Sequence, residues 1–154
     1  MPGIMRELGY RSGIVGKEGT HEIPTRPSNT FIWDEEFPLT KVTVKGAEWN
    51  EKAANKHREM DYEAVEKFIK QDTIPFCLFV ASSLPHGPLL TKIDNGMEGY
   101  AANNWYTDYQ FGKYMEMLEK AGKMENTVVI FVSDNGSNTP RSKYTLYEPG
   151  VHIP

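Results

Sequence analysis

The sequence predicts an α/β fold in which helices flank a mainly parallel sheet. Three short apolar runs, at 11–15, 76–81 and 127–133, alternate with two longer segments whose apolar residues recur at helical spacing. This alternation is typical of parallel sheets that are covered by helices on both faces. The 154 residues are 39% apolar and 12% aromatic, which is enough core-forming material for one packed domain.

The first third of the chain starts with regular elements and then loses its patterning. Residues Gly3 to Leu8 are expected to form a short helix that ends at Gly9, and Arg11 to Val15 a strand. From Glu22 to Leu39 three prolines interrupt a polar and aromatic stretch. This composition predicts an irregular loop region that extends to about residue 50.

Two helices and two strands are expected in the remainder. Asn50 can cap a helix that runs to about Gln71. The run Phe76–Ala81 predicts a strand buried on both faces, as does Thr127–Ser133. A second helix is expected from about Met97 to Ala121, with Gly122 as its cap. Its predicted apolar stripe consists of Ala101, Trp105, Gly112, Met115 and Leu118.

Charge and composition exclude several classes of function. The net charge of −4, from 17 basic and 21 acidic residues, argues against nucleic acid as a partner. The longest apolar runs are far shorter than a membrane span of about 20 residues, and no signal peptide is visible at Met1 to Tyr10. The single cysteine, Cys77, cannot form an internal disulfide or a cysteine-based metal site.

Residues whose side chains could take part in catalysis or ligand binding follow the predicted strands. Parallel sheets place their active and binding sites at this end of the strands. Asp134 and Asn135 offer two oxygen donors that suit calcium or magnesium, although Asp-Asn-Gly is also a common turn sequence. His86 stands between two prolines and can act as acid, base or anion ligand, or pack in a loop. Lys17, near two glycines and His21, suits a sulfate or phosphate oxygen.

Lys143 lies among aromatic residues, and by itself this indicates only a cation in aromatic surroundings. For Lys17 a solvated surface position is the usual alternative. Other charges, including the run from Lys52 to Arg58, fit the wet face of a helix.

Taken together, the segments closely resemble successive motifs of the sulfatase family within the alkaline-phosphatase superfamily. The matching segments, in order, are GYRSGIVGK, PFCLFVASSLPHGP, DYQFG, TVVIFVSDNG and KYTLYEPGVHIP. The resemblance implies a sulfatase-like fold and an enzyme that hydrolyses sulfate esters with a divalent metal. It covers the chain from about residue 1 to 154, apart from the loop region of 22 to 50.

The resemblance also implies roles for single residues. Asp134 and Asn135 match metal ligands, for calcium or else magnesium. Lys17, His86 and Lys143 match catalytic residues that also bind the sulfate group. In the motif that contains the first lysine, Gly19 stands where the family has histidine, so that His21 is the nearest candidate substrate ligand. Near the end of the chain, Pro149 and His152 replace the family's usual glycine and arginine.

The motif that supplies the family's nucleophile is missing. Sulfatases use a formylglycine made from the cysteine or serine of C/S-x-P-x-R. Cys77 is followed by apolar residues, and Ser83 to Pro85 is followed by Gly87 where arginine is required. Neither is expected to serve, and the paired Asp-Asp that completes the metal site is also absent. We therefore expect an incomplete catalytic domain that holds calcium weakly and is inactive by itself.

Several alternatives remain open from the sequence. The chain is expected to be part of a sulfatase acting on a small sulfate ester or sulfated glycan. The alternatives are a noncatalytic anion-binding or split-enzyme subunit with the same fold, and a phosphate-ester hydrolase of the same superfamily. Unpaired strand edges predict a homo-oligomer or association with missing sulfatase segments. The resemblance suggests a periplasmic or secreted parent enzyme.

Overall fold

The computed structural model describes residues 2–16, 33–38, 47–48, 59–71, 74–87, 89–90, 92–93, 96–137 and 140–153. The chain divides into two compact units, Met1–Met124 and Glu125–Pro154. In chain order, the elements are α1 (Pro2–Glu7), β1 (Arg11–Gly16), β2 (Glu35–Pro38), β3 (Ala47–Glu48), α3 (Tyr62–Lys70), β4 (Phe76–Ala81), β5 (Lys92–Ile93), α4 (Gly99–Lys120), the 3-10 turn η2 (Met124–Asn126) and α5 (Glu148–Val151).

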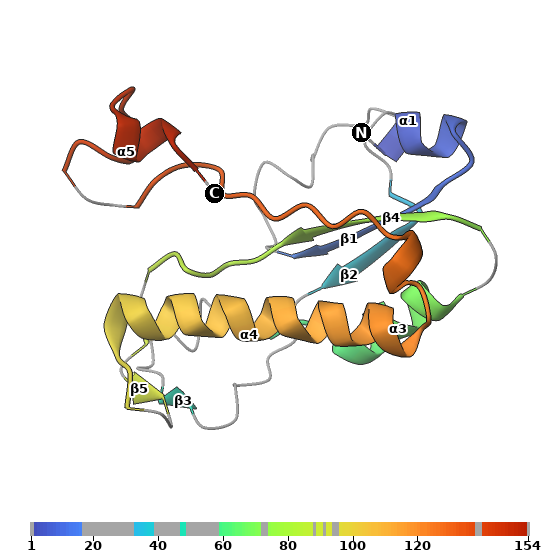
Figure 1. Ribbon diagram of the computed structural model, residues 1–154, viewed down its shortest axis with the longest axis horizontal. Coiled ribbons are helices and arrows are strands. Elements are labelled where there is room, and N and C mark those ends of the chain that lie inside the picture. The colour runs from blue at the N-terminus through green and yellow to red at the C-terminus, as the bar shows by residue number, and fades with distance from the viewer. Residues whose placement is uncertain are drawn as a thin grey trace. The chain divides into compact units, whose positions relative to one another are not determined.

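A three-stranded parallel sheet organises the first unit. Its strand order is β2-β1-β4, and β1 pairs along its whole length with β4, from Arg11 opposite Phe76 to Gly16 opposite Ala81. The short strands β3 and β5 form a separate antiparallel pair. Figure 1 shows α3 and α4 on one side of the three-stranded sheet and α1 on the other. The predicted α/β class with a mainly parallel sheet is confirmed.

The main core lies between this sheet and helices α3 and α4. Its buried side chains are Val15, Met60, Val65, Phe68, Ile69, Tyr114, Met117 and Leu118. Gly13 faces the same core, and a Cβ atom there would lie 2.9 Å from the ring of Phe68. The missing side chain in β1 therefore makes room for the largest fully buried side chain of α3.

Burial along the strands differs from the sequence prediction. β1 is the central strand and five of its six residues are buried, whereas β4 is half-buried, with Phe79 and Val80 exposed. The prediction that β4 is buried on both faces is therefore wrong. The reason is position: among the described strands β4 has a neighbour on one side only. An apolar run indicates a strand, but not how many strands flank it.

The predicted buried strand at 127–133 is also wrong. These residues belong to the second unit and form no strand, and the side chains of Val128, Ile130 and Val132 are 87%, 77% and 65% exposed. β-branched side chains favour extended backbone, but a strand exists only where a neighbouring backbone supplies its hydrogen bonds. The described residues 127–133 have no such ladder.

Two further boundaries differ from expectation. The irregular region predicted over 22–50 contains β2 and β3, and β2 pairs with β1 although Pro38 ends it. The helix expected from Asn50 begins in the described chain at Tyr62. Its cap is Asp61, whose carboxylate accepts a hydrogen bond from the Ala64 backbone at 3.0 Å. Asn50 itself lies outside the described residues.

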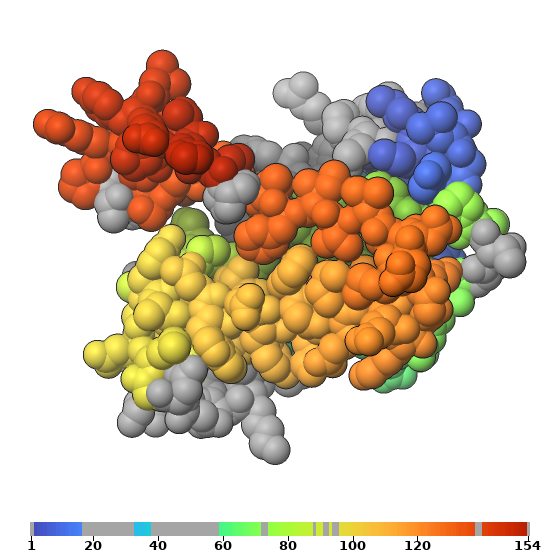
Figure 2. Space-filling view, in the orientation of Figure 1, coloured from blue at the N-terminus to red at the C-terminus, as the bar shows by residue number. Residues whose placement is uncertain are grey.

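Helix α4 has about the expected length, but its buried face matches the predicted stripe only in part, at Leu118. Ala101 and Trp105, predicted to be buried, are exposed, and Figure 2 shows the outer side of α4 open to solvent in yellow and orange. The buried residues are Ala102, Asn103, Tyr106, Gln110, Tyr114, Met117 and Leu118. Two of them, Asn103 and Gln110, are amides. A stripe chosen by hydrophobicity alone therefore lies largely on a different part of the helix surface from the buried face.

No helix in the described part of the chain is long and apolar enough to cross a membrane.

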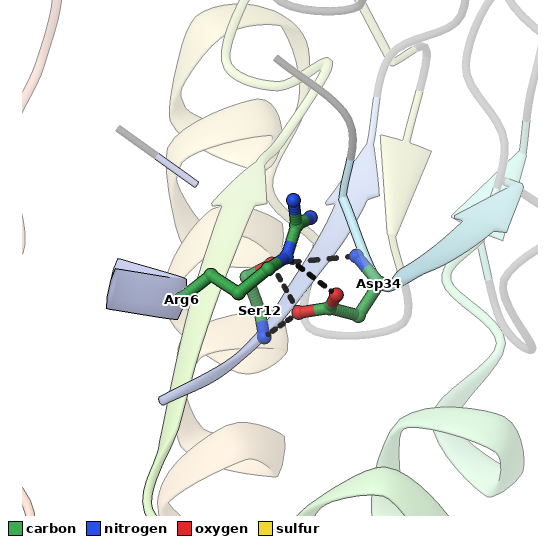
Figure 3. Close-up of polar contacts among 3 residues, drawn as sticks. All are labelled: Arg6, Ser12 and Asp34. Atoms are coloured by element: carbon green, nitrogen blue, oxygen red, sulfur yellow. Dashed lines mark hydrogen bonds and ion pairs between the residues drawn. The ribbon is translucent and has the colours of Figure 1, made fainter. Parts of the chain in front are cut away.

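The chain that enters β2 is fixed to β1 by one carboxylate (Figure 3). Asp34 Oδ2 accepts hydrogen bonds from the Ser12 backbone and hydroxyl, both at 2.7 Å, and Oδ1 accepts one from Arg6 Nε at 3.1 Å. Burial by itself raises the pKa of Asp34, but these hydrogen bonds outweigh it and leave the pKa below its ordinary value. Ionised Asp34 therefore stabilises the folded state.

We predict that this contact makes stability depend on pH. Because the folded-state pKa of Asp34 is lowered, its stabilising contribution is complete above the unfolded pKa of about 3.9 and is lost as the pH falls through the folded value. Asp34→Asn should lower the urea midpoint at pH 7 and flatten its decline below about pH 4. Glu36→Gln, at an exposed site on β2, is the control; equal acid dependence in wild type and Asp34→Asn would contradict the prediction.

Candidate active site

The carboxyl ends of β1 and β4 lie against each other at one edge of the sheet. A Cβ atom on Gly16 would lie 2.5 Å from the carbonyl oxygen of Ala81, so only glycine permits this approach. Residues that follow the two strands therefore leave from neighbouring points. Lys17 comes directly after β1, but it lies outside the described residues, as does His21. Their predicted roles stay predictions.

His86 is presented on the segment that follows β4. Its side chain is exposed, and its Nδ1 lies 2.6 Å from the Gly87 carbonyl oxygen. A carbonyl oxygen only accepts hydrogen bonds, so this contact assigns the hydrogen of the neutral ring to Nδ1. Nε2 is then the nitrogen that can take up a proton and deliver it. The histidine is therefore suited to proton transfer or, when charged, to anion binding.

Two buried amide side chains of α4 contact the chain after β4: Asn103 holds the His86 segment itself, and Gln110 contacts Ser82, directly after the strand. Asn103 contacts the backbone of Pro85, His86 and Leu90. Two helical turns later, the Gln110 side-chain oxygen accepts a hydrogen bond from the Ser82 hydroxyl at 3.0 Å, and that hydroxyl accepts one from the Leu84 backbone. The Leu84–Pro85 peptide bond is cis. The position of this loop is therefore set by polar contacts to a helix.

Asp134 and Asn135 lie in the second unit, in a bend of the chain. The Asp134 side chain is exposed and Asn135 is half-buried. The hydroxyl of Ser133 donates a hydrogen bond of 2.7 Å to the Asn135 carbonyl oxygen, which stabilises the bend. Both side chains carry oxygen atoms of the kind that calcium and magnesium prefer. The turn interpretation and the ligand interpretation are therefore compatible.

Lys143 lies in the same unit, on a segment with unusual backbone geometry. Its backbone N–H donates a hydrogen bond of 3.1 Å to the Ser137 carbonyl oxygen, and its Nζ lies 5.2 Å from the centre of the Tyr144 ring. Arg141 and Tyr144 have φ angles of 61° and 67°, a region that residues other than glycine seldom adopt. Strained backbone of this kind is frequent at functional sites.

Close backbone contacts bring the two segments of the second unit together. The backbone N–H of Gly136 donates to the Gly150 carbonyl oxygen at 3.2 Å, and a Cβ atom on Gly136 would overlap the Pro149 carbonyl. The hydroxyl of fully buried Ser142 donates to that same Pro149 oxygen at 2.8 Å. Asp134 and Asn135, just before Gly136, are thereby joined to the segment that carries Lys143.

The described residues do not form a complete metal site by themselves. Among them no group of three or more histidine, cysteine, aspartate or glutamate side chains is placed to hold a metal ion. Asp134 and Asn135 offer two side-chain oxygens, whereas calcium takes six to eight ligands. Residues in the described ranges therefore do not complete a calcium site.

Neither candidate for the family's nucleophile has a suitable environment. Cys77 lies in β4 and is half-buried rather than fully buried, and burial raises the pKa of its thiol. The reactive thiolate is thereby disfavoured. Ser83 is buried, with 7% of its surface exposed, and its sequence context lacks the required arginine. The sequence-based rejection of both residues agrees with these surroundings.

The predicted site residues thus fall into two groups. His86 belongs to the first unit, and Asp134, Asn135 and Lys143 belong to the second. The residues that hold these groups, Asn103 and Ser142, are not among the candidates predicted from the sequence. In sequence, buried Asn103 cannot be told from its exposed neighbour Asn104. No sequence signal marks Ser142 either.

Comparison with known proteins identifies the relatives of this chain. The sulfatase family model matches residues 1–154. An ulvan-active sulfatase from Formosa agariphila is 25% identical over 152 residues, covering 94% of this chain and 22% of the relative. Human N-sulphoglucosamine sulphohydrolase is 25% identical over 199 residues, covering 100% of this chain and 37% of the relative. The chain thus spans less than two fifths of either protein.

Solved structures share the fold. The crystal structure of Ps i-CgsB in complex with k-i-k-neocarrahexaose has a TM-score of 0.60 and 21% identity, covering 88% of this chain and 39% of the other. That of PsFucS1 sulfatase from Pseudoalteromonas sp. has a TM-score of 0.60 and 20% identity, covering 99% and 43%. Because the family model matches every residue from 1 to 154, the chain belongs to the sulfatase family.

Proposed function

We propose that this chain is the part of a sulfate-ester hydrolase that binds the sulfate group and contributes to a metal site. The observation that carries the proposal is the joining of Asp134 and Asn135 to the Lys143 segment through Gly136, Ser142 and Pro149. A cation and two oxygen donors in one small unit suit a substrate anion beside a metal ion. The match to the sulfatase family over the whole chain supports the same chemistry.

Each residue has a chemical task in this proposal. Lys143 and Lys17 supply positive charge to the sulfate oxygens, and His86 delivers a proton from Nε2 to the departing oxygen. Asp134 and Asn135 contribute side-chain oxygens to the metal. Sulfatases are generally metal-dependent, and we propose calcium, with magnesium as the alternative. The metal would polarise the ester, and the remaining ligands must come from residues other than those described.

A sulfated glycan is the substrate class that we favour. One relative is an ulvan-active sulfatase, and one solved structure with the same fold holds a carrageenan oligosaccharide. These substrates belong to those proteins, and they support a polyanionic sugar as the starting point for assays. Screening should therefore begin with sulfated polysaccharides and include an aryl sulfate as a general reporter.

We predict that the 154-residue chain does not turn over an aryl sulfate in the presence of calcium. It has no C/S-x-P-x-R segment to provide a nucleophile, and acid-base assistance by itself contributes only about 10²- to 10⁴-fold. Product release measured by absorbance should equal that in buffer, with a complete sulfatase as the positive control. Clear turnover that is abolished by His86→Ala would overturn this expectation.

Sulfate binding tests the proposed role of Lys143. Titration with sodium sulfate at constant ionic strength, followed by amide chemical shifts, should show saturable changes near Lys143. Lys143→Ala should weaken binding about tenfold, because one hydrogen bond to a charged group is worth about 1.5 kcal/mol. Lys120→Ala removes the same charge from an exposed position on α4 and serves as the control. An equal loss of sulfate affinity in both variants would mean that the net charge of the chain, and not the position of Lys143, determines binding. Tighter binding of phosphate than of sulfate would favour the phosphate-ester alternative.

Calcium should bind weakly to this chain. With one carboxylate and one amide available, we expect a Kd of about 1 mM or weaker. The amide resonances of Asp134 and Asn135 should shift during a calcium titration, and Asp134→Asn should abolish the shift. Asp108→Asn, at an exposed position on α4, should leave it unchanged. Micromolar affinity that survives Asp134→Asn would place the metal elsewhere.

A further inference from the structure

The side chain of Asn103 in α4 makes three hydrogen bonds to the backbone of one loop. It is fully buried, and its oxygen accepts a hydrogen bond from the Leu90 backbone at 2.9 Å. Its amide nitrogen donates to the carbonyl oxygens of Pro85 at 3.2 Å and His86 at 3.1 Å. One side chain thus satisfies three backbone groups at both ends of a single loop.

The backbone and the ring of His86 have different surroundings. The carbonyl oxygen of His86 is held inside by Asn103, while the imidazole is exposed and turns to the Gly87 carbonyl. The loop around them is anchored by Leu84 and Leu90, which are buried in a cluster with residues of α4. With its backbone fixed and one ring nitrogen engaged, His86 keeps a defined direction for Nε2.

We propose that Asn103 is a positioning residue that sets the orientation and the ring tautomer of His86. This inference rests on the proposed function, in which the histidine Nε2 meets the sulfate ester. A buried amide is suited to the task because it offers one acceptor and two donors, which match the Leu90 N–H and the two carbonyl groups. Aspartate retains the acceptor and removes both donors, and alanine removes all three.

Gln110 provides a matched comparison within the same helix. It is also a buried amide, two turns farther along, and it bonds Ser82 and the buried carboxylate of Glu59. Replacement of either amide removes buried hydrogen bonds and lowers stability. Only the replacement of Asn103 removes the hydrogen-bond donor to the carbonyl oxygens of Pro85 and His86. A purely structural role would therefore make the two sites behave alike.

The test uses ring nitrogen resonances of His86 in the 154-residue chain, recorded above neutral pH by long-range ¹H–¹⁵N spectra and assigned with His86→Gln. Wild type should show separate Nδ1 and Nε2 positions that identify the Nδ1–H tautomer. In Asn103→Asp and Asn103→Ala the two resonances should move toward a common averaged position. In Gln110→Ala they should stay as in wild type, even where the urea midpoint is lower.

Hydrogen exchange at Leu90 separates loop positioning from general unfolding. Its amide should stay protected in wild type and in Asn103→Asp, which retains the acceptor, and should exchange faster in Asn103→Ala. Averaged His86 resonances in wild type, a measurement that needs no variant, would overturn the proposal. So would unchanged resonances in a folded Asn103 variant, or the same change in Gln110→Ala.

A sulfate titration distinguishes this proposal from the proposed function. If sodium sulfate leaves the wild-type resonances of His86 unchanged while the tautomer depends on Asn103, the sulfate-binding function fails and the positioning role stands. If sulfate shifts His86 equally in wild type and in Asn103→Asp, the positioning role fails and the function stands. If both proposals hold, sulfate shifts the His86 ring resonances in wild type, and the shift is several-fold weaker in Asn103→Asp.

Discussion

The parallel pairing of β1 with β4 is the constraint on which the rest of the first unit depends. It extends over six residue pairs and ends where Gly16 lies against the Ala81 carbonyl. Because both strands run in one direction, the chain segments that follow them begin at the same edge. A side chain at residue 16 would force the strands apart there. The close approach of the two strands at Gly16 therefore lies at the edge from which both following segments start.

The two units use the same physical means to fix the backbone at a candidate site residue. His86 is exposed while its backbone is held by buried Asn103, and Lys143 follows fully buried Ser142, whose hydroxyl binds the Pro149 carbonyl. Buried polar groups cost free energy unless every donor and acceptor is paired, so such contacts have little freedom to rearrange. A fixed backbone thereby limits the directions in which the side chain can point.

The sequence was sufficient for what depends on local pattern, and insufficient for what depends on neighbours. β4 was predicted with its observed bounds because its six successive residues are all apolar, and Asp134 and Lys143 were chosen as candidates because they stand in short motifs. The apolar run 127–133 was misjudged because strand formation requires a partner backbone that no local pattern reports. Asn103 was missed because an amide on a buried face is indistinguishable, in sequence, from an amide facing water.

The contact between Gly136 and Pro149 has a consequence for how this protein can change over time. The absence of one methyl group lets two segments lie against each other, so neither can drift in conformation without the other. Any residue larger than glycine at position 136 would meet the backbone of a stretch of chain more than ten residues away. A graft of either segment into another sulfatase would therefore have to carry its counterpart.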